Sequence, residues 1–159
     1  MSIEVRTLPE QHVVYMRYVG PYGAAGIPEL WKRFQQWMQE RDLATPDAMK
    51  LGVAHDNPSI TPAEKCRYDA CLVVPRDFAP DRWVNAADIP GGRYAVAQFR
   101  GTAHEIQGAW DQVFSGWLPG SGYEPDGDRP CVEVYRGDPT VDARSGAFRC
   151  ELCLPVKPL

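Results

Sequence analysis

The sequence predicts an α+β fold, in which two pseudo-symmetric β-α-β-β modules form a mainly antiparallel sheet with helices on one face and a central ligand groove. Three observations lead to this prediction. The order of sequence patterns repeats after about 80 residues. Each half carries one stretch with the apolar spacing of a helix, between stretches that alternate like strands. The later strands of each half are joined by short connections, which favours antiparallel pairing.

The two halves correspond segment by segment. The helix of the first half carries Trp31, Phe34 and Trp37, and that of the second half carries Trp110, Phe114 and Trp117. Each half closes with an apolar strand stopped by a proline, at Pro75 and Pro155. On this register Gly52 corresponds to Glu133. Because the seam between packed units is a favoured place for a ligand pocket, this single acid is the first candidate for a binding residue.

The chain is expected to form a single domain over residues 1–159, with module one at 1–76, a linker at 77–87 and module two at 88–159. Strands are predicted over 3–8, 12–19, 50–55, 67–74, 93–100, 131–136 and 148–154. One helix is predicted from 27 to 41. A second is predicted after the capping box Thr102–Glu105, and residues 119–130 are predicted to be a loop.

The composition excludes several classes of function. A net charge of −4 argues against direct binding of nucleic acid. No segment approaches 18 apolar residues and the first residues lack a signal peptide, so no membrane association and a cytoplasmic location are expected. The five cysteines are expected to be free thiols, and the spacing of Cys150 and Cys153 leaves a redox role open. The three histidines lie in separate elements and no cofactor motif is present, so neither a metal nor another cofactor is predicted.

Glu133 lies in a predicted strand. Strand alternation places Cys131, Glu133 and Tyr135 on one face and the two valines between them on the other. The valines are expected to face the helices and Glu133 the opposite side. A solvated strand face is one interpretation of such an acid. The alternative is a receptor for an organic cation, because glycine opposite the acid leaves room and aromatic rings attract cations.

The aromatic residues divide into two groups. Those at helical spacing are expected to belong mainly to the core. The ligand-binding candidates that accompany Glu133 are Tyr22, Tyr68, Trp83, Trp110 and Tyr135. The hydroxyl of Tyr68 could also donate a hydrogen bond to a ligand.

These features resemble the GyrI-like small-molecule-binding domain, the effector-binding module of AraC-type and MerR-type multidrug regulators. The resemblance runs from Val5 to Val156. It rests on Arg17–Tyr22, Trp31 with Trp37, Gly52–Pro58 with Thr61–Pro62, Arg67–Cys71, Ile89–Gly92, Trp117–Pro119, Pro130–Tyr135 and Leu154–Val156.

The resemblance implies a central groove in which a buried glutamate meets cationic, lipophilic drugs among aromatic rings, and by motif that glutamate is Glu133. No helix-turn-helix pattern precedes residue 3 or follows residue 155, so a stand-alone module is expected. Any signal to DNA would then require a protein partner. The sequence leaves the oligomeric state open.

Three functions follow from these observations. The favoured one is binding of planar, amphiphilic, cationic small molecules, as in multidrug or toxin binding. The second is a hydrolase that opens cyclopropane-type rings of DNA-alkylating natural products, with Glu133 as general base and Tyr68 or Tyr135 as hydrogen-bond donor. The third is a protein inhibitor of DNA gyrase.

Overall fold

The computed structural model describes residues 1–137 and 141–159. Within them the strands are β1 (Ile3–Leu8), β2 (Gln11–Val19), β3 (Met49–Ala54), β4 (Arg67–Val73), β5 (Asn85–Ile89), β6 (Gly92–Gly101), β7 (Tyr123–Pro125), β8 (Cys131–Arg136) and β9 (Phe148–Pro158). The helices are α1 (Gly26–Glu40) and α2 (Ile106–Asp111). Helix α2 continues as a π-helical segment over Gln112–Trp117 and a 3-10 turn over Leu118–Gly120. A further 3-10 turn spans Ala63–Lys65.

The order of the strands shows the internal repeat. The sheet runs β1-β6-β9-β8-β3-β4-β2-β5, with every neighbouring pair antiparallel, and β7 pairs with the end of β9. In the repeat β1 corresponds to β5, β2 to β6, β3 to β8 and β4 to β9. The order is therefore the same when it is followed from either edge. The predicted α+β class and antiparallel sheet are confirmed.

The two modules exchange their first strands. Strand β1 pairs with β6 of the second half, and β5 pairs with β2 of the first. Residues 77–87 were predicted to be a linker, yet Asn85–Ile89 form β5. The strand is only five residues long, and Ala87 and Ile89 alone mark the side that packs on the inner cluster, which is too short an alternation to predict a strand. Strand β7 likewise lies within the predicted loop and forms through its pairing with β9.

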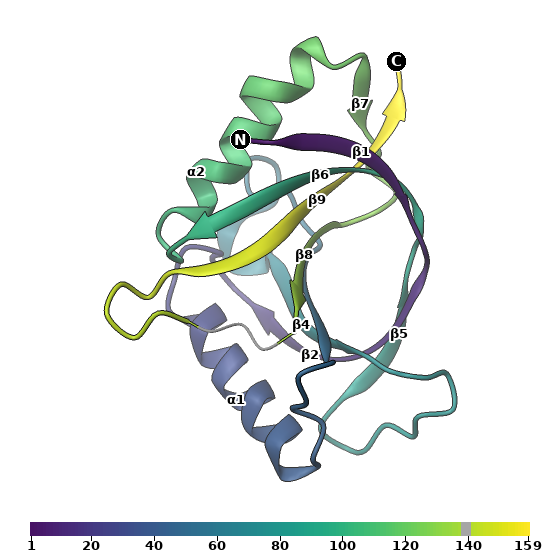
Figure 1. The fold of residues 1–159 in the computed structure, drawn as a ribbon, viewed down its shortest axis with the longest axis vertical. Helices are drawn as coiled ribbons and strands as arrows, with labels where there is room; N and C mark the ends of the chain where they lie inside the picture. Colours follow the sequence, from purple (N-terminus) through teal and green to yellow (C-terminus); the bar gives the residue numbers. More distant parts are fainter. Residues whose placement is uncertain (138–140) are drawn as a thin grey trace.

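The sheet curls because two very short connections join its opposite ends. Pro9 and Glu10 alone join β1 to β2, and Pro90 and Gly91 alone join β5 to β6. Figure 1 shows the resulting ring of strands, in which β1 and β5 close the side away from the helices. The two connections cross at close range, since a Cβ on Gly91 would lie 2.6 Å from the Glu10 nitrogen and 2.7 Å from the Leu8 carbonyl oxygen.

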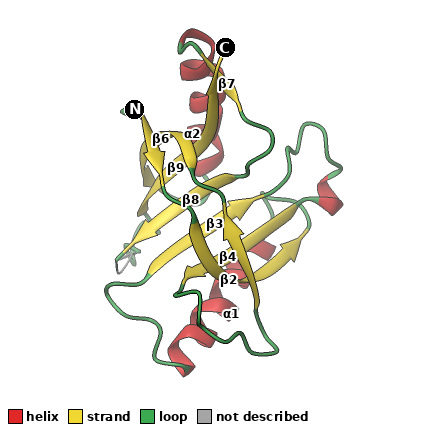
Figure 2. Cartoon of the chain, turned by 90° about the vertical axis from the view of Figure 1, so that its right-hand side faces the viewer, coloured by secondary structure: helices red, strands yellow, loops and turns green. Residues whose placement is uncertain are grey.

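The curled sheet is covered on both faces. Its inner face is filled by one cluster of buried side chains, which comprises Val13, Leu51, Val53, Cys71, Ile89, Tyr94, Val96, Val132, Val134 and Cys153. Both helices lie on the outer face, α1 over the first half and α2 over the second (Figures 1 and 2). The helices thus share one face, as predicted. None of the helices in the described ranges is long and apolar enough to cross a lipid bilayer.

The orientation predicted for strand β8 is wrong. Val132 and Val134 belong to the inner cluster, whereas Cys131 and Tyr135 pack with the residues of α2 on the outer face. Glu133 therefore points towards the helices. Alternation separates the two faces of a strand, but it does not say which face the helices cover when both are buried.

Candidate functional site

Glu133 lies where the two halves of the molecule meet. Strands β3 and β8 are adjacent and antiparallel, and Gly52 is the residue directly opposite Glu133. These two positions also correspond to each other in the internal repeat. Equivalent residues that face each other across an antiparallel pair lie on the pseudo-two-fold axis, so the acid projects at the centre of the sheet.

A chain of hydrogen bonds holds the carboxylate. The hydroxyl of Tyr68, which is buried on β4, donates to Oε1 of Glu133 at 2.7 Å, and that of Tyr135 donates to the same oxygen at 3.1 Å. The indole N–H of Trp31 on α1 donates to the Tyr68 hydroxyl at 3.1 Å. The absent side chain of Gly52 makes this arrangement possible, because a Cβ there would collide with the Tyr68 hydroxyl and lie 2.5 Å from Oε1.

Aromatic rings surround the acid. The ring of Trp31 meets that of Tyr135 edge-on, with ring centroids 5.6 Å apart. The ring centroids of Tyr135 and Phe148 are 6.0 Å apart. A hydrogen bond from Trp110 on α2 also lowers the pKa of the Glu133 carboxyl. Trp31 and Trp110 are equivalent in the repeat, so the two helices frame Glu133 symmetrically. Glu133, Trp31, Trp110 and Tyr135 are only half-buried, which leaves them within reach of a ligand.

Burial sets the protonation of these groups. Desolvation raises the pKa of Glu133, and the hydrogen bonds from Tyr68, Tyr135 and Trp110 offset this rise only in part. Burial also raises the pKa of the Tyr68 and Tyr135 hydroxyls, and the charge of Glu133 raises it further. Both tyrosine hydroxyls therefore remain neutral donors.

Asp69 is a buried acid on the same sheet, and it has Arg17 and His55 as partners. Asp69 on β4 accepts two hydrogen bonds from Arg17, at 2.8 and 3.0 Å, and lies 2.6 Å from Nε2 of His55. Burial alone would raise the pKa of Asp69, but His55 and Arg17 outweigh it and the pKa is lowered. By contrast, every hydrogen bond recorded to Glu133 in the described part of the chain comes from a neutral donor.

The structure brings most of the predicted binding residues together, but not all of them. Tyr68, Tyr135 and Trp110 meet at Glu133. Tyr22 lies next to Tyr68 and packs edge-on against it, with ring centroids 6.4 Å apart. Its hydroxyl donates a hydrogen bond to the Arg67 carbonyl oxygen.

Trp83 is not brought to this cluster. It is 57% exposed on the segment before β5, and the guanidinium of Arg82 lies 4.7 Å from its ring centre. The adjacent Asp81 anchors this segment to α1 by accepting hydrogen bonds from Trp37 and Arg41.

Two residues of the cluster were not predicted. Trp31 was assigned to the core with the other helical aromatics, and Phe148 was not considered. The repeat could have identified both. Trp31 is the counterpart of Trp110, and Phe148 precedes Pro155 by the same interval that separates Tyr68 from Pro75.

The cysteines are free and stand on different faces. Cys150 packs with the residues of α2 on the outer face and Cys153 belongs to the inner cluster, because an interval of three along a strand reverses the face. Cys131 is half-buried on the same face as Glu133, and burial with the nearby carboxylate raises the pKa of its thiol to about 12. Within the described residues, no group of three His, Cys, Asp or Glu side chains converges as a metal site.

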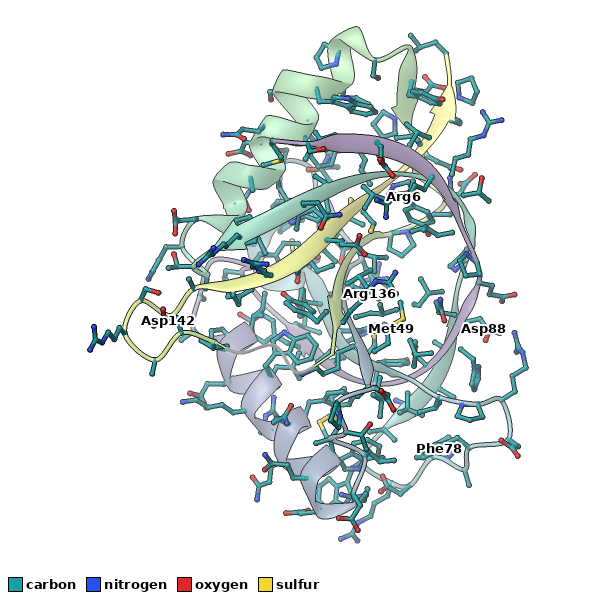
Figure 3. The ribbon with its side chains drawn as sticks, in the orientation of Figure 1. Arg6, Met49, Phe78, Asp88, Arg136 and Asp142 are labelled. Carbon is teal, nitrogen blue, oxygen red and sulfur yellow. The ribbon has the colours of Figure 1, made fainter. Side chains whose placement is uncertain are left out.

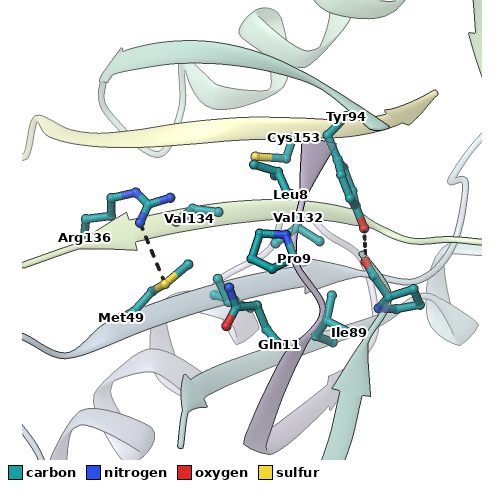
Figure 4. A pocket seen from close by; sticks show the side chains of 12 residues that line it. Leu8, Pro9, Gln11, Met49, Ile89, Tyr94, Val132, Val134, Arg136 and Cys153 are labelled. Atoms are coloured by element: carbon teal, nitrogen blue, oxygen red, sulfur yellow. Dashed lines mark hydrogen bonds between the residues drawn. The ribbon is translucent and has the colours of Figure 1, made fainter. Parts of the chain in front are cut away.

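A small hollow lies on the inner face of the sheet. Figure 4 shows it between Leu8, Ile89, Tyr94 and Val134, with Arg136 beside Met49 at one end. In Figure 3 these last two side chains lie inside the ring of strands. The volume of this hollow, about 40 Å³, is far below the roughly 300–1,000 Å³ of a drug-sized pocket. We take the outer face at Glu133 as the candidate ligand site because the acid, its hydrogen-bond donors and the aromatic rings lie together there.

The chain belongs to the GyrI-like family, since the GyrI-like small molecule binding domain matches residues 1–157. It is 36% identical to the SPbeta prophage-derived protein YosT of Bacillus subtilis (strain 168), over 99% of this chain and 100% of that protein. It is 30% identical to the DNA gyrase inhibitor of Citrobacter rodentium (strain ICC168), over 100% of this chain and 99% of the inhibitor.

Solved structures share the fold. The C-terminal domain of EcmrR superposes with a TM-score of 0.76 at 17% identity, covering 99% of this chain and 98% of that domain. SAV2435 bound to tetraphenylphosphonium superposes with a TM-score of 0.64 at 17% identity, covering 99% of this chain and 94% of that one.

Proposed function

We propose that this protein binds lipophilic, aromatic, organic cations at Glu133, on the outer face of the sheet between α1 and α2. One observation supports this most directly. The glutamate is desolvated among aromatic rings and is hydrogen-bonded by neutral donors, whereas the buried Asp69 has Arg17 and His55 beside it. A desolvated charge of this kind favours a ligand that supplies the opposite charge, and ring faces add about 0.5–2 kcal/mol per cation–π contact.

The relatives support the same proposal. A protein of the same fold was solved with tetraphenylphosphonium, which is an aromatic cation without hydrogen-bond donors. That likeness carries the fold alone, so the assignment of ligand class to this chain rests on the residues around Glu133. The location that we propose with it is the cytoplasm.

Substitution of the acid tests the proposal. We expect Glu133→Gln to weaken the binding of tetraphenylphosphonium by roughly tenfold to a hundredfold, because the amide keeps the shape and loses the charge. Isothermal titration calorimetry measures this. Glu124→Gln on β7 is the control, since the Glu124 side chain is 47% exposed and pairs with Lys157. Equal affinity of wild type and Glu133→Gln would overturn the role of the charge.

Inhibition of DNA gyrase is a second candidate. It is favoured by relatives of that name which match over nearly their whole length at 30% identity. A supercoiling assay with purified gyrase and this protein tests it, and unchanged supercoiling at micromolar protein would argue against it.

Hydrolysis of electrophilic rings is a third candidate at the same site. It is favoured by the raised pKa of Glu133, which suits a general base, and by two phenol donors within hydrogen-bonding distance of it. Mass spectrometry of cyclopropane compounds incubated with the protein would detect ring opening. Turnover that persists in Glu133→Ala would remove the glutamate from this reaction.

A further inference from the structure

We propose that the inner face of the sheet carries a docking surface for an acidic segment of a partner protein, formed by Arg100 on β6, Arg149 on β9 and Arg136 on β8. We call these three residues the arginine row. The Glu133 site lies on the outer face, so this inference stands apart from the proposed function.

The arginine row crosses three neighbouring strands, since β6, β9 and β8 are adjacent in the sheet. Arg100 and Arg149 lie directly opposite each other in the β6–β9 pair. Nε of Arg136 donates a hydrogen bond at 3.1 Å to Oε1 of Glu151, which is two residues from Arg149 on β9. All three arginines are exposed, because they lie at the ends of their strands. In Figure 1 the end of β6 lies beside the start of β9.

Strand alternation turns the row to the inner face. The chain neighbours of its three members are Phe99, Cys150 and Tyr135, and all of these pack with the residues of α2 on the outer face. Successive side chains of a strand point to opposite faces, so the arginines point away from α2. The inner face is therefore basic at this end, whereas Glu133 makes the outer face acidic.

The charges of the row are not balanced where they stand. Like charges directly opposite each other destabilise a sheet, and Arg100 and Arg149 form such a pair. No ion pair or hydrogen bond of the Arg149 side chain is recorded within residues 1–137 and 141–159. The charge of Asp142 attracts Arg100, but its carboxylate already accepts hydrogen bonds from the backbone of its own loop (Figure 3).

Glu151 does not neutralise the row either. Its carboxylate accepts hydrogen bonds from Arg136 at 3.1 Å, from Gln98 at 2.9 Å and from Arg6 at 3.3 Å. One carboxylate thus serves two arginines on opposite sides of it, and the repulsion between Arg100 and Arg149 remains.

The first half of the molecule neutralises the equivalent position. Val19 and Arg100 correspond in the repeat, and their partners across the sheet are Arg67 and Arg149. Asp56 holds Arg67 through two hydrogen bonds, at 2.9 and 3.0 Å. Arg67 therefore faces a valine and an acid, whereas Arg149 faces a second arginine. An acidic partner would supply the charge that the second half lacks.

The geometry favours a short acidic protein segment as this partner. Neighbouring strands are about 4.8 Å apart, so the row spreads its charges over roughly 10 Å of open surface. Guanidinium groups bind carboxylates through paired hydrogen bonds. The net charge of −4 repels a long polyanion such as a nucleic acid. A short segment senses mainly the charges within a Debye length of about 8–10 Å, which here are the arginines.

Fluorescence anisotropy with fluorescein-labelled hexaglutamate tests the proposal. We expect wild type to bind the peptide at low ionic strength and to lose affinity as salt is added. Arg149→Gln should weaken binding by roughly threefold to fivefold, as for one well-aligned exposed ion pair. The double variant Arg100→Gln/Arg149→Gln should weaken it by about tenfold. Its melting temperature should be no lower than that of wild type, because the substitutions remove a repulsion.

Arg33→Gln is the matched control. It removes the same charge from the exposed surface of α1, so it should keep the wild-type affinity. Wild type that does not bind hexaglutamate, or equal affinity of Arg149→Gln and Arg33→Gln, would overturn the proposal. A labelled thymidine heptanucleotide, which carries the same charge as the peptide, should bind more weakly. Tighter binding of the nucleotide would overturn the choice of an acidic protein segment in favour of nucleic acid.

Discussion

At the scale of single residues, the site depends on one asymmetry between two similar halves. The repeat places glycine at one position and glutamate at its counterpart, and the fold sets them opposite each other. Glycine allows the Tyr68 hydroxyl to approach, and glutamate accepts its hydrogen bond. A side chain at position 52 would therefore disturb the site and the packing together.

Gly52→Ala tests this close approach. We expect a loss of about 1–3 kcal/mol in the free energy of unfolding, because the new methyl group must push Tyr68 from its buried position. Binding of tetraphenylphosphonium should change as well, since the hydrogen bond to Glu133 is broken. Chemical denaturation and calorimetry measure the two effects. Unchanged stability and affinity would show that Tyr68 does not occupy this space.

Glu133 should also make stability depend on pH. A carboxyl with a raised pKa binds its proton more tightly in the folded protein than in the unfolded chain, so stability falls as pH rises from the unfolded pKa towards the folded one. We therefore expect Glu133→Gln to melt at a higher temperature than wild type at pH 7. This advantage should shrink below about pH 4, where the glutamate is protonated in both states. An advantage that is constant with pH would contradict the raised pKa.

At the scale of elements, the two helices that frame the site are built differently. Helix α1 runs for 15 residues and buries Leu30, Phe34, Trp37 and Met38. Helix α2 has six residues before it widens into the π-helical segment, and it buries only Ala109, with Val113 just beyond its end. Helix α2 also contains Gly108, whose missing side chain faces open space. Helix α2, which carries Trp110, is thus the less stable of the two helices.

Gly108→Ala tests the weakness of α2. Alanine at an open helical position should stabilise the protein by about 0.5–1 kcal/mol, since it restricts the unfolded chain and meets no neighbour. Hydrogen exchange followed by mass spectrometry should show slower exchange over 106–120 than in wild type. In wild type this segment should exchange faster than 26–40. Equal protection of both helices would contradict this description.

At the scale of the whole molecule, the halves are joined into one folding unit. Each gives its first strand to the other, and the two short connections that do so cross where Gly91 meets the backbone of Leu8 and Glu10. The inner cluster includes Leu8 of β1 and Ile89 of β5, and the cluster under α2 includes Ile3 and Val5 of β1. Folding should therefore be a single cooperative transition, and neither module should be stable alone.

Gly91→Ala tests the crossing. A Cβ there meets backbone atoms that cannot rotate away, so we expect a loss of at least about 1–3 kcal/mol in the free energy of unfolding. Gly127→Ala is the matched control, because a Cβ at Gly127 meets nothing within 4 Å. Denaturant melts of both variants provide the comparison. The crossing would be refuted if the two substitutions had the same small effect.

The repeated pattern of residues was enough to predict the duplicated architecture and the acid at its centre. Periodicity and the repeat register are local properties of the chain, and they identified both helices, most of the strands and the pair Gly52 and Glu133. Strand β5 was not predicted because it is only five residues long and its alternation consists of Ala87 and Ile89 alone. The exchange of strands between the halves, the side to which Glu133 points, and the presence of Trp31 and Phe148 beside it without Trp83 appear only in the folded chain. Those outcomes depend on which segments meet in space, and alternation along a strand is the same whichever face the helices cover.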